Sequence, residues 1–376
     1  MVFMKIGIIT IHKIINYGSV LQAFALQKTC EGMGVETEII DYTFPNKFHR
    51  NNPYVLDQDK ISYESKWIKL LFGWALLRQH RGIRSFIRNY QRLTPHKYNS
   101  PEALKKDAPQ YDVYISGSDQ LWSPRHCNGD PAFMLDFAPD SARKISYASS
   151  IGSLDIPKEL EPQYCSLLSR YSQLSVREKS GVEIIKKFTR KEVRSVLDPT
   201  LLLNHNAWNK IAVPKRLVKK KYILCYLLNY SFNAFPYADN LVGHIQKETG
   251  YEVVRVARPP HHLTIRHNHY RIGASPEEFL ALVRDAEIVV TTSFHGTAFA
   301  LNYGRPVFSV IKDRGSHDCR QSDLLRQLGL EQQIITINDD YPSASRAFYD
   351  YTKEQEALEK LREYSISYLN NAIYGK

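Results

Sequence analysis

The sequence predicts an α/β protein made of two doubly wound, Rossmann-like lobes with a cleft between them, and three observations support this prediction. The chain has 376 residues, which is too long for one ordinary hydrophobic core and suits two domains. Strand, helix and strand patterns follow one another near the N-terminus and again in Glu287–Ile311. Asn204–Lys220 combines asparagine, proline and a run of positive charge, as connections between domains do. The expected units are residues 1–203, residues 204–350, and a helix in residues 351–376 that packs back on the first lobe.

Composition is that of an ordinary globular protein. Hydrophobic residues make up 43% of the chain and charged residues 24%, which argues against a disordered or membrane-spanning protein. The longest apolar run, Trp67–Leu77, contains Lys69 and reaches about half the length of a bilayer span. The N-terminus enters a strand without a signal-peptide pattern, so we expect a cytoplasmic protein.

Neither cysteines nor histidines have the spacing of a metal site. The five cysteines include no CxxC pair, which also argues against a disulfide scaffold; they are Cys30, Cys127, Cys165, Cys225 and Cys319. Four of the thirteen histidines lie in Arg258–His269 but lack the i, i+4 spacing of a helical metal pair. We therefore expect a loop there and no metal.

Positive charge is concentrated in two segments. The formal net charge is +11, and Arg78–Arg92 and Lys215–Lys221 carry much of it. The chain has no zinc finger, aromatic RNA-binding motif or helix-turn-helix, so nucleic acid is not an expected partner. An anionic lipid surface and a diphosphate-linked substrate both fit this charge, and an ordinary solvated helix face is the simplest alternative.

The N-terminal lobe is predicted to open with a right-handed βαβ unit. Its strand, helix and strand are Lys5–Ile11, Ser19–Gly34 and Val35–Asp41. Ligands of doubly wound domains bind outside the carboxyl ends of the strands, where Asn16, Tyr17 and Gly18 fall. Plain turn chemistry is the alternative explanation for these three residues.

Two later strand ends of this lobe carry charged residues. Strands are expected at Tyr111–Ser116, Lys144–Ser149, Gln173–Val176 and Val193–Leu197, and helices at Ser65–Gln91, Pro157–Arg170 and Ser180–Lys187. Asp119 follows the first of these strands as a candidate general base, or as a cap of the next turn. Arg177 directly follows Val176, which suits bidentate binding of a phosphate or carboxylate; the alternative is a surface ion pair with Glu178. Asp198, Pro199 and Thr200 are expected to form a rigid turn.

The strongest candidate for a ligand site lies in the C-terminal lobe. Strands are expected there at Tyr222–Leu227, Tyr251–Val256, Ile288–Thr292, Pro306–Val310 and Gln333–Ile337, and helices at Ala238–Thr249, after Ser275, at Thr297–Tyr303, at Gln321–Gly329 and at residues 353–372. A tight turn through His295 joins Ile288–Thr292 to its helix. Because a helix N-terminus offers free N–H groups and the positive end of its dipole, we expect an anionic substrate at Ser293–Thr297. His295 can hydrogen-bond that anion and move a proton, or only cap the helix.

Seven short blocks resemble the polysaccharide pyruvyl transferase family in sequence and in order. They are Asn16–Gln22, Ser116–Trp122, Ile145–Ser149 with Gly152, Ser175–Glu178, Leu197–Thr200, Thr292–Thr297, and Arg320 before Leu324-Leu325. Each block is weak alone, but together they span roughly residues 5 to 330, and SFHGT in its strand, turn and helix setting is the most specific.

The resemblance implies a fold like that of the GT-B glycosyltransferases and a reaction of capsule, exopolysaccharide or cell-wall glycan assembly. Phosphoenolpyruvate would be the donor, a sugar diol the acceptor and a cyclic pyruvate ketal the product, with no other cofactor. The acceptor could be a polysaccharide or a lipid-diphosphate-linked oligosaccharide. The second possibility, together with peripheral association with an anionic membrane, rests on Arg78–Arg92 and Trp67–Leu77.

Site residues follow from the match of motifs. His295 and Arg177 look like the donor-binding pair, and Ser293, Phe294, Gly296, Thr297 and Arg320 lie beside them. We interpret His295 as general acid or phosphate anchor and Asp119 as base for a sugar hydroxyl. The N-terminal lobe is the expected acceptor side, with Asn16, Tyr17, Gly18, Ser118 and Gln120. Related glycan enzymes can carry an arginine directly before the Phe-His pair, where this chain has Thr292-Ser293.

Two other functions stay open at this point. A GT-B nucleotide-sugar glycosyltransferase has the same architecture, although its retaining forms hold the ribose with glutamates after a C-terminal-lobe loop. This chain has no glutamate between Ile288 and Gly329. A non-catalytic anion-binding or scaffold protein of a glycan assembly complex is the third reading.

Overall fold

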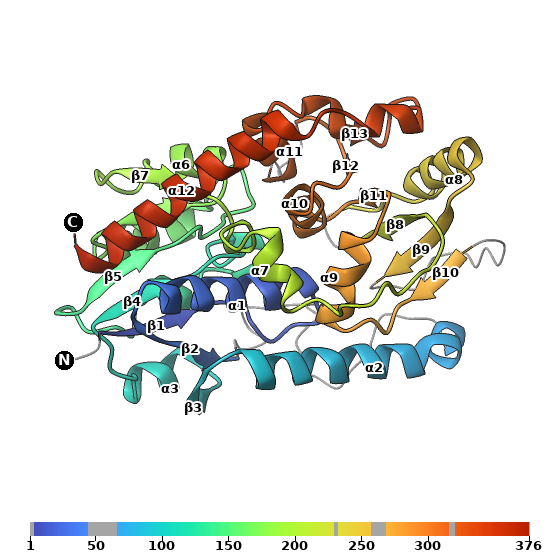
Figure 1. Cartoon of the computed structure of the whole chain (residues 1–376). Coiled ribbons are helices and arrows are strands. Elements are labelled where there is room, and N and C mark those ends of the chain that lie inside the picture. Colours follow the sequence, from blue (N-terminus) through green and yellow to red (C-terminus); the bar gives the residue numbers. More distant parts are fainter. Residues whose placement is uncertain (1–3, 44–65, 229–231, 257–267, 316–319, 376) are drawn as a thin grey trace.

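The computed structural model describes residues 4–43, 66–228, 232–256, 268–315 and 320–375. Two parallel sheets, each covered by helices, form two lobes (Figure 1). The predicted two-lobed α/β class is therefore confirmed. Most of the histidine-rich stretch, residues 257–267, and Cys319 lie outside the described residues.

The N-terminal sheet has the strand order β3-β2-β1-β4-β5. Its strands are β1 (Lys5–Ile9), β2 (Glu36–Tyr42), β3 (Leu93–Tyr98), β4 (Val113–Ser116) and β5 (Arg143–Ser146). Two short strands, β6 (Leu174–Val176) and β7 (Val193–Ser195), pair with each other, and single bridges join β6 to the β5 end of the sheet. The helices of this lobe are α1 (Tyr17–Gly32), α2 (Lys66–Tyr90), α3 (Pro101–Lys106), α4 (Pro124–Cys127), α5 (Glu161–Leu168) and α6 (Lys179–Ile185).

The alternation of strand side chains divides the core of this lobe in two. Ile6 and Ile8 of β1 pack in a cluster with α1 and with the C-terminal helix α12 (Thr352–Tyr374). Ile9, the next residue, packs on the opposite face with Tyr114 and with residues of α3 and α5. Helices thus cover both faces of the sheet, as a doubly wound domain requires.

The C-terminal sheet has the order β10-β9-β8-β11-β12-β13 and is also parallel throughout. Its strands are β8 (Tyr222–Tyr226), β9 (Glu252–Val256), β10 (Asn268–Arg271), β11 (Ile288–Thr291), β12 (Val307–Ile311) and β13 (Ile334–Thr336). The helices of this part of the chain are α7 (His205–Asn209), α8 (Tyr237–Thr249), α9 (Pro276–Arg284), α10 (Phe294–Asn302) and α11 (Arg320–Gln327). Both sheets share the order 3-2-1-4-5 of the Rossmann fold, which places the crossover point beside the first strand.

The largest hydrophobic cluster continues from one lobe into the other. The ring of Tyr17, at the start of α1, stacks on that of Phe279 in α9 with centroids 4.6 Å apart. Its hydroxyl donates to the carbonyl of Ala274 and accepts from Gln79 of α2. Tyr17 is 1% exposed. It therefore joins the lobes and is not presented to an acceptor, contrary to our expectation for this residue.

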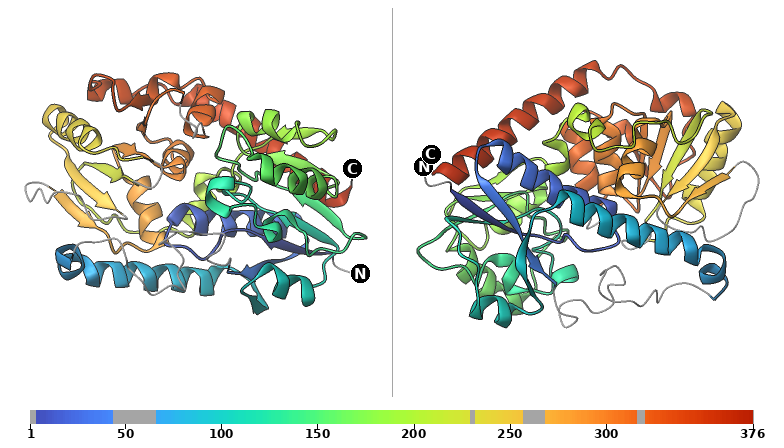
Figure 2. Two further views of the ribbon diagram at one scale, coloured as in Figure 1. Left: turned by 180° about the vertical axis from the view of Figure 1, so that it is seen from behind. Right: turned by 60° about the horizontal axis from the view of Figure 1, so that its bottom comes forward.

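The last helix, α12, also contacts both lobes (Figures 1 and 2). Near its start, Gln355 donates to the carbonyl of Leu301 in the C-terminal lobe. Further along, Ser365 accepts from the backbone N–H of Leu197, and the hydroxyl of Tyr368 donates to the carbonyl of Ser146 in β5.

Some expected boundaries were wrong. Strand β10 begins at Asn268, inside the stretch predicted as a loop, and α10 begins at Phe294, three residues before the predicted start. Ser293 explains the earlier start, because its side chain caps the helix by accepting from the N–H of Gly296. None of the described helices combines the length and apolar character needed to cross a membrane.

We predict that Phe279→Ala destabilises the whole protein. Phe279 is fully buried and contacts the rings of Tyr17, Tyr226 and Phe299. Removing a buried aromatic ring costs about 3–5 kcal/mol of unfolding free energy. Urea unfolding should show this loss, whereas Phe348→Ala, at a position 46% exposed, should change the value by about 0.5 kcal/mol or less. Equal effects of the two substitutions would contradict a shared core.

Candidate active site

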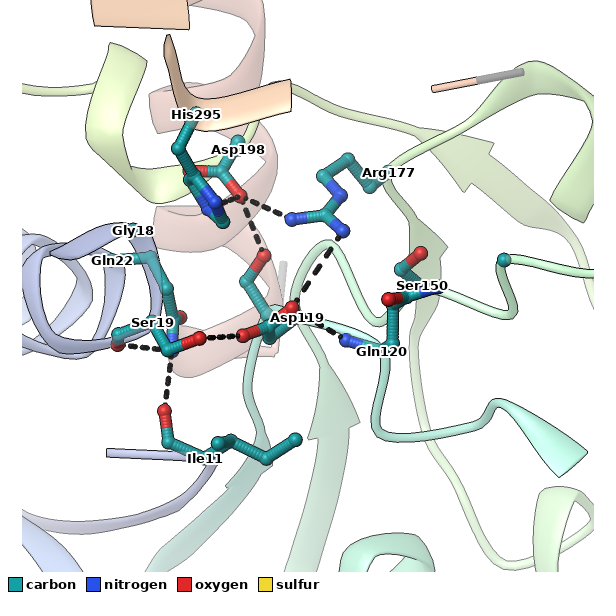
Figure 3. A network of polar contacts seen from close by, with 12 residues as sticks. Ile11, Gly18, Ser19, Gln22, Asp119, Gln120, Ser150, Arg177, Asp198 and His295 are labelled. Carbon is teal, nitrogen blue, oxygen red and sulfur yellow. Dashed lines mark hydrogen bonds and ion pairs between the residues drawn. The ribbon is translucent and has the colours of Figure 1, made fainter. Parts of the chain in front are cut away.

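Charged side chains from both lobes meet where the carboxyl ends of the strands face each other (Figure 3). Asp119 follows β4, Arg177 follows β6 and Asp198 follows β7, all in the N-terminal lobe. His295 follows β11 in the C-terminal lobe. This is the edge at which doubly wound sheets bind ligands.

Asp198 is the centre of the network, although the sequence indicated only a rigid turn. Its side chain is fully buried. One carboxylate oxygen, Oδ1, accepts from the N–H and the hydroxyl of Thr200 at 2.9 and 2.7 Å. The other, Oδ2, accepts from Nη1 of Arg177 at 2.7 Å and from the hydroxyl of Ser118 at 3.0 Å. The turn is thus present, and it aims a carboxylate at the other lobe.

His295 reaches this carboxylate from the first turn of α10. Its Nε2 lies 3.6 Å from Oδ2 of Asp198 and has no hydrogen-bond partner among the described residues. On its other side the ring lies against α1, since a Cβ at Gly18 would stand only 2.0 Å from Nδ1. Glycine is needed at position 18 because any side chain would occupy the place of the imidazole.

Arg177 keeps N–H groups for a ligand. It is 5% exposed, and its guanidinium lies 4.4 Å from the centre of the Phe294 ring. Nη1 is bound to Asp198, but Nε and Nη2 have no hydrogen-bond partner within the described part of the chain. Buried donors of this kind are costly unless something binds them. A planar anion could accept from both at once.

The alternative role for Arg177, an ion pair with Glu178, is not what the structure contains. One carboxylate oxygen of Glu178 accepts from the hydroxyl of Ser150 and from the N–H groups of Ile151 and Gly152. Glu178 therefore stabilises the neighbouring loop, and the guanidinium of Arg177 binds Asp198 and faces the site.

Asp119 lies near Nη2 of Arg177, whereas Asp198 binds Nη1 of the same guanidinium. The hydroxyl of Ser19 donates to its Oδ2 at 2.5 Å, and Nη2 of Arg177 lies 3.9 Å from Oδ1. Oδ1 also accepts from the N–H of Gln120, so the expected turn cap is present as well. Asp119 has φ of 80°, a left-handed conformation that few residues other than glycine adopt but that aspartate adopts more readily than most.

Both carboxylates are kept ionised by their neighbours. Burial alone would raise the pKa of Asp119, but the charges of Arg177 and His295 and the hydrogen bond from Ser19 leave that pKa below its ordinary value. Burial likewise opposes ionisation of Asp198, and His295 and Arg177 outweigh it, so the pKa of Asp198 is strongly lowered. Two carboxylates are thus balanced against the cationic side chains around them.

The remaining donor residues surround Phe294. Arg320 begins α11, is 4% exposed, and its guanidinium lies 6.0 Å from the centre of the Phe294 ring. The ring of Phe294 thus lies near two arginines, one from each lobe. At the start of α10, the N–H groups of Phe294 and His295 have no acceptor within the helix and point toward the site end.

Ser293, Gly296 and Thr297 hold the start of α10 in place. Ser293 caps the helix, and the hydroxyl of Thr297 pairs with that of Ser309 in β12 at 2.9 Å. Gly296 permits close packing, since a Cβ there would lie 2.3 Å from Oγ1 of Thr291. The hydroxyls of Ser293 and Thr297 and the absence of a side chain at Gly296 thus position the turn, and direct contact of these residues with the donor stays a prediction.

Two of the acceptor candidates, Ser118 and Gly18, contact the charged network, whereas Asn16 and Gln120 make other contacts. Ser118 belongs to the network through Asp198, and Gly18 touches His295. Asn16 caps α1 by accepting from the N–H of Gly18 at 2.9 Å. Gln120 is 8% exposed and packs against Gly152 at the edge of the site.

Sequence reasoning missed two residues, Asp198 and Ser19. Asp198 directly follows an expected strand, just as Arg177 does. Because that position was the reason to interpret Arg177 as functional, it was a usable signal for Asp198 as well. Ser19 lies in the block Asn16–Gln22 that resembles the family, but its place near a helix start gave no local reason to single it out. Among the described residues no group of three or more His, Cys, Asp or Glu side chains is placed to hold a metal ion.

The sequence matches the family model of polysaccharide pyruvyl transferase over residues 16–313. A comparison with curated proteins finds no significant match. The family match covers both lobes and includes Asp119, Arg177, Asp198 and His295, whereas Arg320 lies beyond its end.

Solved structures show the same fold at low sequence identity. A putative UDP-N-acetylglucosamine 2-epimerase from Listeria monocytogenes is 11% identical, with a TM-score of 0.50 over 96% of this chain and 91% of that chain. The UDP co-structure of MnaA from S. aureus is 12% identical, with a TM-score of 0.50 over 96% and 90%. Arabidopsis thaliana UGT89C1 complexed with UDP-L-rhamnose is 11% identical, with a TM-score of 0.49 over 99% and 100%. The expected GT-B-like architecture is confirmed, and at these identities the likeness concerns the fold alone.

We predict that Asp198→Asn destabilises the protein at neutral pH by about 3–5 kcal/mol, because it leaves buried positive charge without its counter-charge. A carboxyl whose pKa is lowered by folding stabilises the native state above its unfolded pKa of about 3.9, and this contribution is lost as the pH falls further. The difference in unfolding free energy between wild type and variant should therefore narrow below about pH 4. Urea unfolding at several pH values measures it.

Asp155→Asn is the matched control, since Asp155 is exposed. It should change the unfolding free energy by about 0.5 kcal/mol or less at every pH. A difference in unfolding free energy between wild type and Asp198→Asn that stays constant with pH would contradict the proposed charge pairing.

Proposed function

The chain belongs to the polysaccharide pyruvyl transferase family, and we propose that it moves the enolpyruvyl-derived group of phosphoenolpyruvate onto a sugar diol. The acceptor would be a sugar of a polysaccharide or of a lipid-linked glycan precursor. The products would be a cyclic pyruvate ketal and inorganic phosphate. We place the reaction in the cytoplasm, where phosphoenolpyruvate is made.

One observation carries this proposal: buried N–H donors of both lobes meet beside the ring of Phe294. Phosphoenolpyruvate has a phosphate and a carboxylate, so its site needs two positive or N–H-rich poles. Nε and Nη2 of Arg177 supply one pole. The first turn of α10, with Arg320 beside the ring of Phe294, supplies the other.

The proposed reaction consists of an addition and a substitution. A proton is added to the methylene carbon of the donor, and the adjacent carbon becomes oxocarbenium-like. One sugar hydroxyl attacks this carbon and gives up its proton. The bond to the phosphate oxygen then breaks, and phosphate leaves with the bonding electrons. The second hydroxyl attacks the same carbon, loses its proton and closes the ketal.

His295 is the group best placed to move a proton in this reaction. Its Nε2 has no hydrogen-bond partner within the described ranges, and its ring lies between Asp198 and Gly18. We assign Asp198 as a positioning residue, which holds the imidazole of one lobe and the guanidinium of the other at fixed separation. His295 would then protonate the methylene carbon or the departing phosphate.

Asp119 becomes a base only after the donor binds. Its pKa is lowered chiefly by the charge of Arg177, against the effect of burial, and a carboxylate of lowered pKa is a weak base near neutral pH. An anionic donor would engage Arg177 and so raise the pKa of Asp119. We therefore propose that donor binding precedes removal of a proton from the sugar hydroxyl, with the acceptor near Asn16, Gly18, Ser118 and Gln120.

A nucleotide-sugar glycosyltransferase is the second candidate, because solved structures with the same fold include proteins with bound UDP. This chain lacks a glutamate between Ile288 and Gly329, where retaining forms hold the ribose. The two arginines beside Phe294 also suit a small anion that carries a phosphate and a carboxylate. The two candidates differ in the ligand that should stabilise the native protein.

We predict that phosphoenolpyruvate raises the apparent melting temperature and that UDP and UDP-sugars do not. A ligand at a hundred times its dissociation constant stabilises the native state by about 2.7 kcal/mol. Arg177→Lys should abolish most of the shift, since lysine lacks the planar donors of arginine. Arg190→Lys, at an exposed position, is the control and should retain the shift. Stabilisation by UDP alone would favour the second candidate.

We also predict that His295→Ala abolishes phosphate release in the presence of phosphoenolpyruvate and a panel of glycan acceptors. Loss of general acid catalysis typically lowers the rate by about 10²–10⁴-fold. His295→Asn should keep part of the donor-induced thermal shift, because the amide retains a hydrogen-bond donor, yet should release no phosphate. His205→Ala, at an exposed histidine, should leave turnover unchanged. Phosphate release by His295→Ala at the wild-type rate would refute the assignment. Donor binding by wild type without any release would indicate the scaffold reading.

A further inference from the structure

Helix α2 has an inner face that belongs to the interlobe core. Ile83 and Phe86 are fully buried, and the Phe86 ring packs against Phe24 of α1. Gln79, also buried, donates to the hydroxyl of Tyr17. These contacts fix the rotation of the helix, so the direction of its outer face is determined.

The outer face carries two apolar side chains followed by arginines. Trp74 is 76% exposed and Leu77 45% exposed, which makes them prominent among the exposed large hydrophobic residues. Arg81, Arg84 and Arg88 are also exposed. The five positions are spaced three or four residues apart and so lie along one side of the helix.

The charge of this helix is entirely positive. The segment from Lys66 to Tyr90 contains six lysines and arginines and no aspartate or glutamate. One of the six, Arg78, forms an ion pair with Glu278 of α9. The guanidinium of Arg81 lies 5.9 Å from the centre of the Trp74 ring, so cation and ring share one patch.

We propose that this outer face of α2, formed by Trp74, Leu77, Arg81, Arg84 and Arg88, docks on the headgroup layer of an anionic lipid bilayer. Arginines bind headgroup phosphates through paired N–H groups, and tryptophan favours the boundary between headgroups and acyl chains. A helix with a basic face and exposed Trp and Leu lies in the plane of that boundary. The helix lies at the lower right of Figure 1 and comes forward in the right-hand view of Figure 2.

A lipid surface fits this face better than nucleic acid does. A phosphate backbone would use the arginines but would leave the exposed Leu77 in water. Trp74 and Leu77, on the same side of the helix as the arginines, instead suit a surface that offers phosphates together with an apolar layer beneath them.

A short series of contacts connects helix α2 to the proposed active site. Gln79 of α2 holds Tyr17, and Gly18, the next residue, touches the ring of His295. A protein docked through α2 would thus hold its site near the membrane, where a lipid-linked acceptor is anchored. This consequence rests on the proposed function, whereas docking itself does not.

The test is sedimentation of the full chain with vesicles at low salt. Vesicles of phosphatidylcholine mixed with phosphatidylglycerol should carry the protein down, and vesicles of phosphatidylcholine alone should not. R81Q/R88Q should weaken partition about 25-fold, since each basic residue near an anionic surface contributes roughly a factor of five. The control K187Q/R190Q removes the same charge from exposed positions just beyond α6 and should bind like wild type.

W74S separates docking from simple charge attraction. It should weaken vesicle binding at raised salt, where the arginines are screened and the apolar contact remains. Because vesicle binding needs no phosphoenolpyruvate, it should persist in His295→Ala, so failure of the proposed chemistry would not affect it. Equal loss with both double variants, absence of binding to anionic vesicles, or retention of duplex nucleic acid in place of vesicles would overturn the proposal.

Discussion

The buried carboxylate of Asp198 is the interaction on which the site depends. It accepts from Arg177 of its own lobe and lies 3.6 Å from the imidazole of His295 in the other lobe. A charge in this position would be very unfavourable without both partners, and each partner would be unfavourable without it. The network therefore defines one arrangement of three elements that lie far apart in the sequence.

The interlobe core supports that arrangement mechanically. Tyr17 and Phe279 stack directly, and Gly18, beside Tyr17, is the residue against which His295 rests. Consecutive residues of α1 thus belong to the interlobe core and to the wall of the site. A substitution that loosens the aromatic stack would be felt at the imidazole, because close-packed interiors transmit small displacements.

Local pattern was enough to predict most strands, but contacts between distant segments were not. Ile288–Thr291 and Val307–Ile311 are β-branched or apolar runs, and the sequence places them almost to the residue. Tyr17 looked like part of a ligand loop because its partners come from another lobe and leave no local trace. Asp198 looked like a turn for the same reason: the turn is local, whereas Arg177 and His295 are not. Residues that act through long-range electrostatics are the ones that sequence pattern alone does not reveal.

The position of α12 bears on the order in which the protein folds during synthesis. This helix covers one face of the N-terminal sheet, where Tyr368 and Leu369 share a cluster with Ile6 and Ile8 of β1. Strand β1 thus receives part of its cover from a helix that is made much later than the strand. Until α12 has been synthesised, the part of this face that α1 does not cover remains exposed, and the nascent chain must be kept from aggregating through it. A ribosome that stalls before α12 would release a first lobe with an open apolar side.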